Sequence, residues 1–355
     1  MTSGSTGDAK MIEHSHFGLV NTASSFMLSR GLDEADSGGA MYNDRPFSWV
    51  GGSVIYGLLN GDTRVFRDGR LTMKKDGVFG LWKAVVEEKC TNGFFMPSTI
   101  LDLIENIEEI TKSKYRLKAI LTGGQMISSQ IVDVRKKLCK TVVSLYGLTE
   151  ISVVTSIELD PSTLPGTLGS LFEGVEVKIV DSDSNTLPRQ QLGEICFKCP
   201  WMLKGYRKAS TKRRNAISDG WMNTGDIGII DIEGNLVIKG KAESVIKRHT
   251  LKILSGDVEE CIATLPGVKR VVIIAVPDAR SNEEVCACVV LDQSSGITMD
   301  EVKTHCKEKL GDNITGYAPT YYLQFQVIPM LGTGKPDRMK IKHDALELIN
   351  QKQCV

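Results

Sequence analysis

Residues 118–150 read KAILTGGQMISSQIVDVRKKLCKTVVSLYGLTE and alternate between apolar strands and an amphipathic helix. A strand is predicted over Lys118 to Leu121, followed by a turn at Thr122-Gly123-Gly124. A helix beginning at Ser128 or Ser129 would turn its periodic apolar residues inward, namely Ile131, Val134 and Leu138. The next strand, Val142 to Leu145, ends in Tyr146-Gly147-Leu148-Thr149-Glu150. This alternation, with glycine-rich loops at strand ends, predicts an α/β sheet that binds ligands at its carboxyl edge.

The same alternation extends toward the amino terminus. Residues 17–27 predict a helix, and Ser98 is expected to cap another helix that carries Leu101, Ile104 and Ile107 on one face. Between them, residues 46–52 form an aromatic, turn-rich segment. These patterns support a large α/β domain.

Beyond Val175 the pattern changes to antiparallel sheet. Residues 175–180 and 193–197 alternate, and residues 227–238 carry a hairpin signal around Glu233-Gly234-Asn235. We expect a barrel-like subdomain here, and a hinge near Gly240-Lys241. A small, mobile α+β domain should follow, with helices at 258–264 and 299–310 and strands at 270–276, 285–291 and 321–328. The predicted domains are therefore residues 1–240 and 241–355.

The composition excludes several classes of protein. The 355 residues are 41% hydrophobic, and 43 basic side chains balance 43 acidic ones, so no overall charge favours nucleic acid or an anionic membrane. We see no apolar run long enough to span a bilayer. Nine scattered cysteines argue for a reducing compartment rather than a disulfide framework. Cys196 and Cys199 have metal-ligand spacing without a second pair, so we interpret them as buried in a strand.

The chain opens with TSGSTGDAK at residues 2–10. Glycines let backbone N–H groups turn toward an anion, hydroxyls add donors, and Lys10 supplies a positive charge. This composition suits a polyphosphate, but it lacks the Gly-Lys-Ser/Thr sequence of a Walker A motif. The alternative is a flexible Ser/Gly-rich tail.

Several motifs follow this loop in a fixed order. They are Gly123-Gly124-Gln125, residues 146–150, Gly193-Glu194-Ile195, Thr224-Gly225-Asp226, Gly240-Lys241 and Gly334-Lys335. Together they resemble the adenylate-forming superfamily of acyl-CoA synthetases, luciferases and peptide-synthetase adenylation domains. Residues 283–291 and His305-Cys306-Lys307 are most similar to the medium-chain fatty acyl-CoA synthetases.

This resemblance implies a two-step reaction, in which ATP activates a carboxylate to acyl-AMP and CoA then displaces AMP. The family's phosphate loop maps onto Thr2, Ser3, Gly4, Ser5, Thr6, Gly7 and Lys10. Its nucleotide-binding residues map onto Gly123, Gly124, Gln125, Tyr146, Gly147, Asp226, Lys241 and Lys247. Tyr146 would lie against adenine, and Asp226 would bind the ribose.

The catalytic roles implied by the resemblance fall on Thr149, Glu150 and Lys335. Thr149 would bind the α-phosphate, Glu150 would hold Mg²⁺, and Lys335 would bridge carboxylate and phosphate. An acyl pocket would be lined by Trp49 and Gly147.

The sequence departs from the family's pattern at several places. The family's large N-terminal region before the loop is missing from these residues, which implies an N-terminal truncation with no preceding strand to hold the loop. Lys241 replaces an arginine, and Ser244 replaces the hinge aspartate. His249 and Thr250 replace a glycine pair near the path of the CoA thiol, where their side chains could obstruct thioester formation. No histidine is evident in the aromatic segment.

Three hypotheses follow. The first is an acyl-CoA ligase for a medium-chain fatty acid, and the second is an impaired pseudoenzyme that binds nucleotide or acyl ligands. The third is a ligase for an aromatic carboxylate. In each case the expected partners are small molecules rather than nucleic acid, and the expected compartment is intracellular, either cytoplasmic or mitochondrial. The sequence does not predict an oligomeric state.

Overall fold

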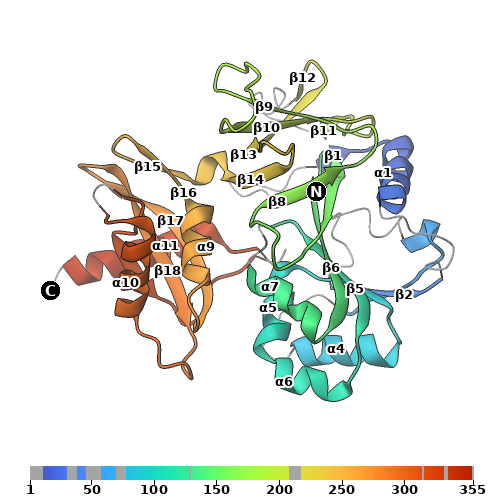
Figure 1. Ribbon diagram of the computed structural model, residues 1–355, viewed down its shortest axis with the longest axis horizontal. Helices are drawn as coiled ribbons and strands as arrows, with labels where there is room; N and C mark the ends of the chain where they lie inside the picture. Colours follow the sequence, from blue (N-terminus) through green and yellow to red (C-terminus); the bar gives the residue numbers. More distant parts are fainter. Residues whose placement is uncertain are drawn as a thin grey trace. The chain divides into compact units, whose positions relative to one another are not determined.

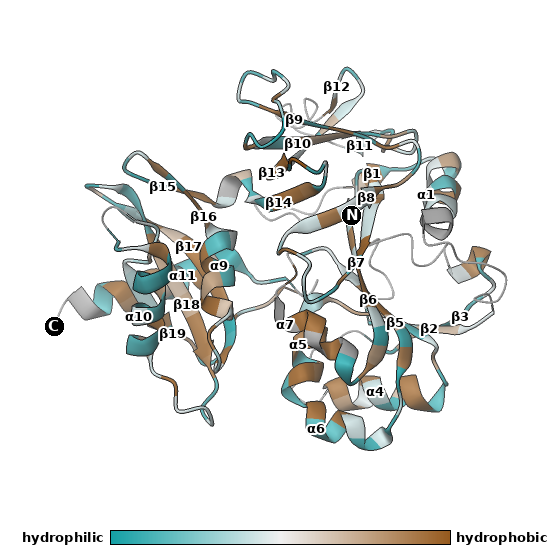
Figure 2. Cartoon of the chain, viewed as in Figure 1, coloured by the Kyte–Doolittle hydropathy of each residue, from teal (hydrophilic) through white to brown (hydrophobic). Residues whose placement is uncertain are grey.

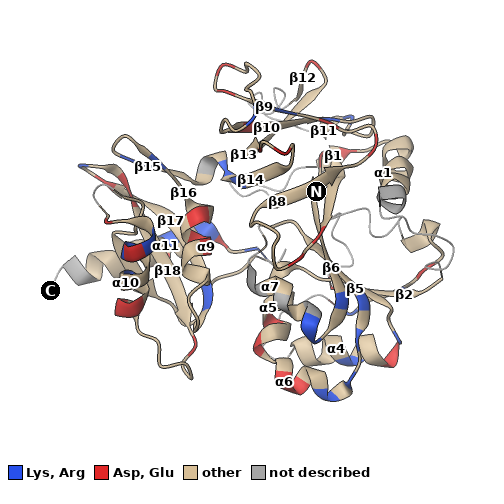
Figure 3. Cartoon of the chain, viewed as in Figure 1, with Lys and Arg blue, Asp and Glu red and all other residues tan. Residues whose placement is uncertain are grey.

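The computed structural model describes residues 11–29, 38–44, 57–68, 77–125, 127, 129–207, 217–313, 316–331 and 335–353 (Figure 1). The chain divides into two compact units. The first runs to Ile238, and the second begins at Lys239 and also includes the short segment 128–130. Acidic and basic residues are interspersed along both units (Figure 3). In the described part of the chain, no helix is long and apolar enough to cross a membrane.

The first unit contains one continuous sheet of twelve strands. Its parallel part consists of β3 (Thr63–Val65), β2 (Ala40–Asn43), β4 (Asn92–Phe94), β5 (Leu117–Gly123) and β6 (Cys139–Leu148). The sheet continues as β7 (Ser152–Glu158), β8 (Thr167–Leu171), β14 (Leu236–Lys241), β13 (Trp221–Ile230), β10 (Gly193–Lys198) and β9 (Glu176–Val180), with β12 (Ile217–Ser218) on β13. The strand pairs β6–β7, β7–β8, β14–β8, β10–β13 and β9–β10 are antiparallel. The predicted antiparallel sheet is therefore present, but the change from parallel pairing occurs at β6–β7, earlier in the sequence than the predicted position beyond Val175.

Helices cover one face of the parallel strands. They are α4 (Gly77–Glu87), α5 (Pro97–Glu105), α6 (Ile107–Ile110) and α7 (Ser129–Val132), with short 3-10 turns at Thr111–Ser113 and Asp133–Lys136. Leu117 and Ile120 of β5 join the hydrophobic cluster under these helices. The predicted inward residues Ile131, Val134 and Leu138 lie in the same cluster. Figure 2 shows the apolar residues that these helices and strands contribute.

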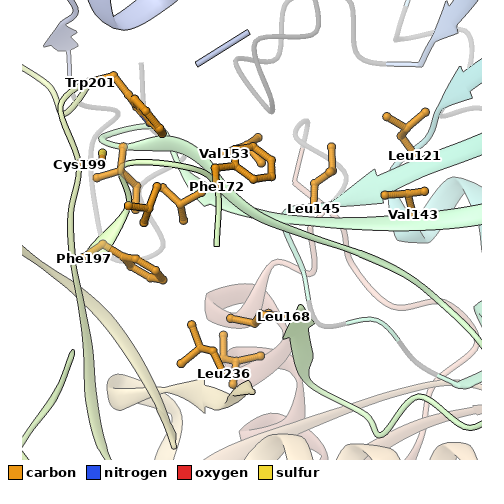
Figure 4. Close-up of a cluster of buried hydrophobic side chains, with 14 of the residues drawn as sticks. Leu121, Val143, Leu145, Val153, Leu168, Phe172, Phe197, Cys199, Trp201 and Leu236 are labelled. Atoms are coloured by element: carbon orange, nitrogen blue, oxygen red, sulfur yellow. The ribbon is translucent and has the colours of Figure 1, made fainter. Parts of the chain in front are cut away.

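A second cluster packs on the other face of β5 and β6 and continues into the antiparallel strands (Figure 4). It joins Leu121 and Leu145 to Phe172, Phe197 and Trp201. Helix α1 (His16–Ser29) contributes Ala23, and the prediction of a helix over 17–27 is confirmed. This shared core fixes the antiparallel strands against the ends of β5 and β6.

The Cys-x-x-Cys motif lies in this core region. Cys196 is 1% exposed and Cys199 is 6% exposed. Burial raises the pKa of Cys196 to about 11 and that of Cys199 to about 12, so both remain neutral thiols at physiological pH. Both cysteines are buried, as we interpreted from the sequence.

The predicted cap of helix α5 is wrong. The helix begins at Pro97, and its N-cap residue, Met96, has no side-chain cap. The carboxylate of Asp44, which follows β2, instead accepts hydrogen bonds from the Met96 backbone N–H at 3.0 Å and from the Thr99 hydroxyl at 2.6 Å. A residue distant in sequence performs the capping role that we assigned to Ser98.

The second unit is a five-stranded sheet with helices on both faces. Its order is β16 (Leu251–Leu254), β15 (Val245–Arg248), β18 (Asn282–Leu291) and β17 (Val268–Asp278), with β19 (Tyr321–Gln324) parallel to β18. Helices α9 (Ser255–Ala263) and α10 (Met299–Leu310) lie on one face, and α11 (Arg338–Gln353) lies on the other. Alternate residues of β17 therefore point to opposite faces of the sheet. Ile273 packs in the cluster under α9 and α10, whereas Val272 and Ile274 pack in the cluster under α11.

Strands β15 and β16 form a tight hairpin that the sequence patterns did not reveal. His249 lies at its turn with φ +51, a left-handed conformation that disfavours residues other than glycine. Both His249 and Thr250 are exposed. A short 3-10 turn (Ala242–Ser244) precedes the hairpin, where the Ser244 hydroxyl donates to the Lys241 carbonyl at 2.8 Å.

We expect Asp44→Ala to lower the free energy of unfolding by about 2–3 kcal/mol, because it leaves a buried backbone N–H and the Thr99 hydroxyl without their acceptor. Asp44 is 1% exposed, so water cannot readily replace it. Chemical denaturation monitored by tryptophan fluorescence measures the change. Asp183→Ala, at an exposed turn, is the matched control and should stay within about 0.5 kcal/mol of the parent. Equal stability of the two variants would contradict the capping role.

Candidate functional site

The candidate site is built where β5 and β6 end. A Cβ atom on Gly123 would lie 2.2 Å from the Leu145 carbonyl oxygen, and one on Gly147 would lie 1.9 Å from that of Ser152. Neither position accommodates a side chain, since real Cβ atoms do not approach backbone so closely. Gly124 has φ +80 and supplies the left-handed turn after β5. Contacts between adjacent strands therefore explain the glycines at positions 123 and 147.

Tyr146 connects the end of β6 to β13. Its hydroxyl donates a hydrogen bond to Asp226 Oδ2 at 2.5 Å, and its ring lies 5.8 Å from that of Phe197. Burial raises the pKa of Tyr146, and the neighbouring Asp226 carboxylate adds to this effect. Asp226 is only 2% exposed. The tyrosine therefore remains protonated and donates to a buried carboxylate.

Further hydrogen bonds connect the motifs on β10 and β13. Glu194 accepts from the Gly225 backbone N–H at 2.9 Å and from Asn223 Nδ2 at 3.3 Å. The Thr224 hydroxyl donates to the Ile195 carbonyl at 2.7 Å and accepts from the Asp226 N–H at 3.0 Å. Three motifs that are far apart in the sequence thus form one network, whose members are Tyr146, Glu194 with Ile195, and Thr224 to Asp226.

A second group of contacts surrounds Glu150 in the turn after β6. The Tyr206 hydroxyl donates to Glu150 Oε1 at 3.0 Å. Burial lowers the pKa of His14, against the opposing effects of a hydrogen bond with the Thr149 backbone and of the nearby Glu150 carboxylate. His14 and Tyr206 were not predicted as site residues. The sequence feature that could have pointed to His14 as a site residue is its position four residues after Lys10.

The same region holds the chain just after the predicted phosphate loop. Strand β1 (Met11–Glu13) pairs antiparallel with β11 (Gly205–Arg207), and Ile12 lies opposite Tyr206. Arg207 Nε lies 3.0 Å from Glu13 Oε1. The strand expected to be missing would precede the loop, whereas β1 lies directly after it and pairs with β11. The loop residues Thr2 to Lys10, and Trp49, lie outside the described part of the chain.

The residues around Glu150 fit a metal ion that arrives with its substrate. Within the described residues, no group of three or more His, Cys, Asp or Glu side chains could hold a metal ion. Mg²⁺ is commonly held by one or two carboxylates together with substrate phosphates. Glu150 is a single carboxylate oriented by Tyr206, which is suited to that kind of shared coordination.

The remaining predicted residues belong to the second unit. Lys241 ends β14, and exposed Lys247 lies on β15, where its backbone N–H donates to Glu283 Oε2 at 2.8 Å. Lys335 is partly buried, and its carbonyl accepts from the Leu331 N–H at 2.7 Å. The predicted site residues are thus distributed over both units of the sequence.

A groove in the first unit lies apart from these residues. It encloses about 410 Å³ and is lined by residues that include Ser156, Glu158, Ser170, Glu233 and Asn235. Among the described residues, none of those predicted for the nucleotide, catalytic or acyl-binding roles lines it. The predicted acyl pocket stays a prediction, because Trp49 lies outside the described part of the chain.

We expect Tyr146→Phe to lower the free energy of unfolding by about 2 kcal/mol at neutral pH, because the buried Asp226 carboxylate loses a donor. The folded pKa of Tyr146 lies above the unfolded value of about 10. The contribution of Tyr146 to the free energy of unfolding is therefore complete below pH 10 and is lost as the pH rises toward the folded pKa. Denaturation from pH 7 to 11 should show a steeper loss of stability in the parent than in Tyr146→Phe. Parallel profiles would contradict this coupling.

Comparison with known proteins assigns these features to a family. Residues 1–207 match the model of the AMP-binding enzyme family, and residues 257–335 match that of the AMP-binding enzyme C-terminal domain. A long-chain-fatty-acid–CoA ligase of Escherichia coli is 29% identical over 72% of this chain and 45% of its own length. The mitochondrial medium-chain acyl-CoA ligase ACSF2 of Danio rerio is 28% identical over 96% of this chain and 56% of its own length. The chain thus spans about half the length of these two relatives.

The fold agrees with this assignment. The crystal structure of the anthranilate CoA ligase AuaEII in complex with anthranoyl-AMP superposes with a TM-score of 0.83 at 20% identity. The match covers 97% of this chain and 66% of that one. The arrangement of a large α/β unit followed by a smaller α+β unit is therefore that of adenylate-forming enzymes. The family match over residues 1–207 shows that the chain belongs to the AMP-binding enzyme family.

Proposed function

We propose that the chain catalyses the ATP-dependent activation of a carboxylic acid to acyl-AMP, followed by thioester formation with CoA. The observation that carries this proposal is the hydrogen-bonded network of Tyr146, Glu194 and Asp226, which joins three of the family's motifs at the end of β6. We further propose a medium-chain fatty acid as the substrate, because the similarity to the medium-chain ligase ACSF2 extends over 96% of this chain.

In this proposal the residues near β6 bind and orient the nucleotide. Thr149 and Glu150 occupy the turn directly after the strand, where a hydroxyl and a carboxylate can meet the α-phosphate and its Mg²⁺. Mg²⁺ would neutralise phosphate charge, and Tyr206 would hold the Glu150 carboxylate in one orientation. Tyr146 would present its ring to adenine while its hydroxyl stays on Asp226. The loop Thr2 to Lys10 would bind the β- and γ-phosphates.

Residues of the second unit are proposed to complete each half-reaction. Lys335 would place a positive charge between the carboxylate and the α-phosphate, where negative charge builds up in the transition state. Lys241 and Lys247 would contact the nucleotide. Movement at the boundary near Gly240 would change the enzyme from the arrangement for adenylation to the arrangement for thioester formation. An intracellular location, in mitochondria or cytoplasm, is proposed on the similarity to ACSF2.

Two other functions remain open to test. An aromatic carboxylate is the alternative substrate, supported by the fold shared with the anthranilate CoA ligase. Binding without turnover is the alternative class, supported by His249 and Thr250 at the exposed hairpin and by Lys241 in place of an arginine. Pyrophosphate release, measured over fatty acids of increasing length and over benzoate-type acids, with and without CoA, separates the three. Nucleotide binding with no release for any acid would overturn the ligase proposal.

We expect Lys335→Ala to reduce adenylation by at least about 100-fold, because it removes a positive charge from the developing phosphoryl transition state. Thioester formation from supplied acyl-AMP should fall much less. Acid-dependent ATP–pyrophosphate exchange measures the first step, and CoA consumption with acyl-AMP measures the second. Lys340→Ala, at an exposed lysine of α11, is the matched control and should retain both activities. An equal loss of both half-reactions in Lys335→Ala would contradict its role.

Replacing both hairpin residues, His249→Gly with Thr250→Gly, is expected to raise the rate of thioester formation about tenfold. This corresponds to an activation barrier that is lower by about 1.4 kcal/mol. Glycine removes two side chains from the proposed thiol path and relieves the positive φ of residue 249. Pyrophosphate exchange should not change, because adenylation does not use this path. The comparison requires acyl-AMP and CoA at saturating and at subsaturating concentrations. An unchanged rate under both conditions would show that the hairpin does not limit thioester formation.

A further inference from the structure

Lys335 belongs to a segment of the second unit that backbone hydrogen bonds close on itself. The Leu331 N–H donates to the Lys335 carbonyl at 2.7 Å, and the Asp337 N–H donates to the Pro329 carbonyl at 2.8 Å. Both bonds lie within the segment, so they set its local shape and do not attach it to the sheet of the second unit.

Arg338 follows this segment directly and is the first residue of α11. Its Nη2 donates to Glu259 Oε1 on α9 at 2.8 Å, and its Nη1 donates to the Ile273 carbonyl on β17 at 2.6 Å. The same Glu259 oxygen accepts a hydrogen bond from the Ile273 backbone N–H at 2.9 Å. Each of these three residues is therefore bonded to the other two.

This three-way contact lies at the edge of the sheet. Strand β17 pairs with β18 and is the last strand in the described order, so the backbone groups on its other side have no neighbouring strand. Helices α9 and α11 lie on opposite faces, so Glu259 and Arg338 approach the Ile273 backbone from two sides. The planar guanidinium bonds a carboxylate and a carbonyl together, which a single exposed ion pair does not do. The contact thus fixes where the chain leaves the Lys335 segment.

We propose that Arg338 is a positioning residue for Lys335 and that Glu259 holds Arg338 in place. This inference rests on the proposed function, in which the Lys335 ammonium meets the α-phosphate during adenylation. A cation stabilises the transition state only when its backbone is already in the correct place, because reorganisation at the moment of reaction costs free energy. Arg338 acts by fixing the backbone three residues after Lys335 and does not itself contact the substrate.

The first test compares the two half-reactions in the full chain. We expect Arg338→Met to lower kcat for acid-dependent ATP–pyrophosphate exchange about tenfold, with a smaller change in the KM for ATP, because Lys335 acts in the transition state. Thioester formation from supplied acyl-AMP should stay within about twofold of the parent. Arg338→Lys should recover part of the lost rate, since it keeps the charge but not the second hydrogen bond.

Lys340→Met is the matched control, because Lys340 lies on the same helix and its ammonium lies 3.5 Å from Asp344. It should retain both half-reactions. Glu259→Gln should lower adenylation in the same direction as Arg338→Met but less strongly, because an amide oxygen is a weaker acceptor than a carboxylate. An equal loss of both half-reactions in Arg338→Met would overturn the proposal, since it would show a general structural role.

A double-mutant cycle tests whether Arg338 acts through Lys335. In the Lys335→Ala background, Arg338→Met should change ATP–pyrophosphate exchange by less than about twofold, because the group that it positions is already gone. Additive losses in the double variant would contradict the proposal.

Hydrogen–deuterium exchange gives a reading that needs no activity. The Leu331 and Asp337 amides should exchange faster in Arg338→Met than in the parent, and Lys340→Met should leave them unchanged. Unchanged amides in Arg338→Met would overturn the positioning role. A parent chain without acid-dependent pyrophosphate exchange would instead overturn the proposed function, and the amide readings would still decide the role of Arg338. If Arg338→Met does not fold, Glu259→Gln gives the same readings.

Discussion

The close approach of β5, β6 and β7 is the constraint on which the candidate site depends. Gly123 and Gly147 let a backbone carbonyl of the next strand lie where a Cβ atom would otherwise be. Strand β6 can therefore pair in parallel with β5 and antiparallel with β7 along one hydrogen-bonded sheet. Tyr146 and Glu150 extend from the end of this central strand, so their positions are set by backbone packing rather than by a flexible loop.

Much of this arrangement follows from local sequence patterns. The period of Ile131, Val134 and Leu138 correctly predicted their burial, although the α-helix ends at Val132 and a 3-10 turn follows it. The Glu233-Gly234-Asn235 signal predicted the β13–β14 turn. Both depend on neighbouring residues only, so they can be read without knowledge of the tertiary structure. The predicted helix over 299–310 has the bounds of α10 for the same reason, since its Thr298–Glu301 capping box is local.

The features that the sequence did not reveal depend on distant partners. Serine is a residue type that often caps helices, which is why Ser98 was predicted as a cap. Asp44 nevertheless caps helix α5, because β2 ends beside it. Tyr206 and His14 reach Glu150 only through the pairing of β1 with β11, which no local pattern encodes. Helix α11 has charged residues throughout and a weak apolar periodicity, so its packing on the sheet through Ile341, Ala345 and Ile349 was missed. The predicted roles of Lys241, Lys247 and Lys335 stay predictions.

The pairing of β1 with β11 also has a consequence for how the chain folds. Residues 14–204 separate these two strands in the sequence, so their contact closes a very long loop. Closing this loop costs conformational entropy, and that cost is offset only once the intervening sheet has formed. The β1–β11 pair is therefore expected to be one of the last contacts to form. It is also a pair of only three-residue strands, and such short peripheral ladders open at low free energy while the remaining structure stays folded. The β1–β11 pair is therefore expected to open at a lower free energy than the twelve-stranded sheet.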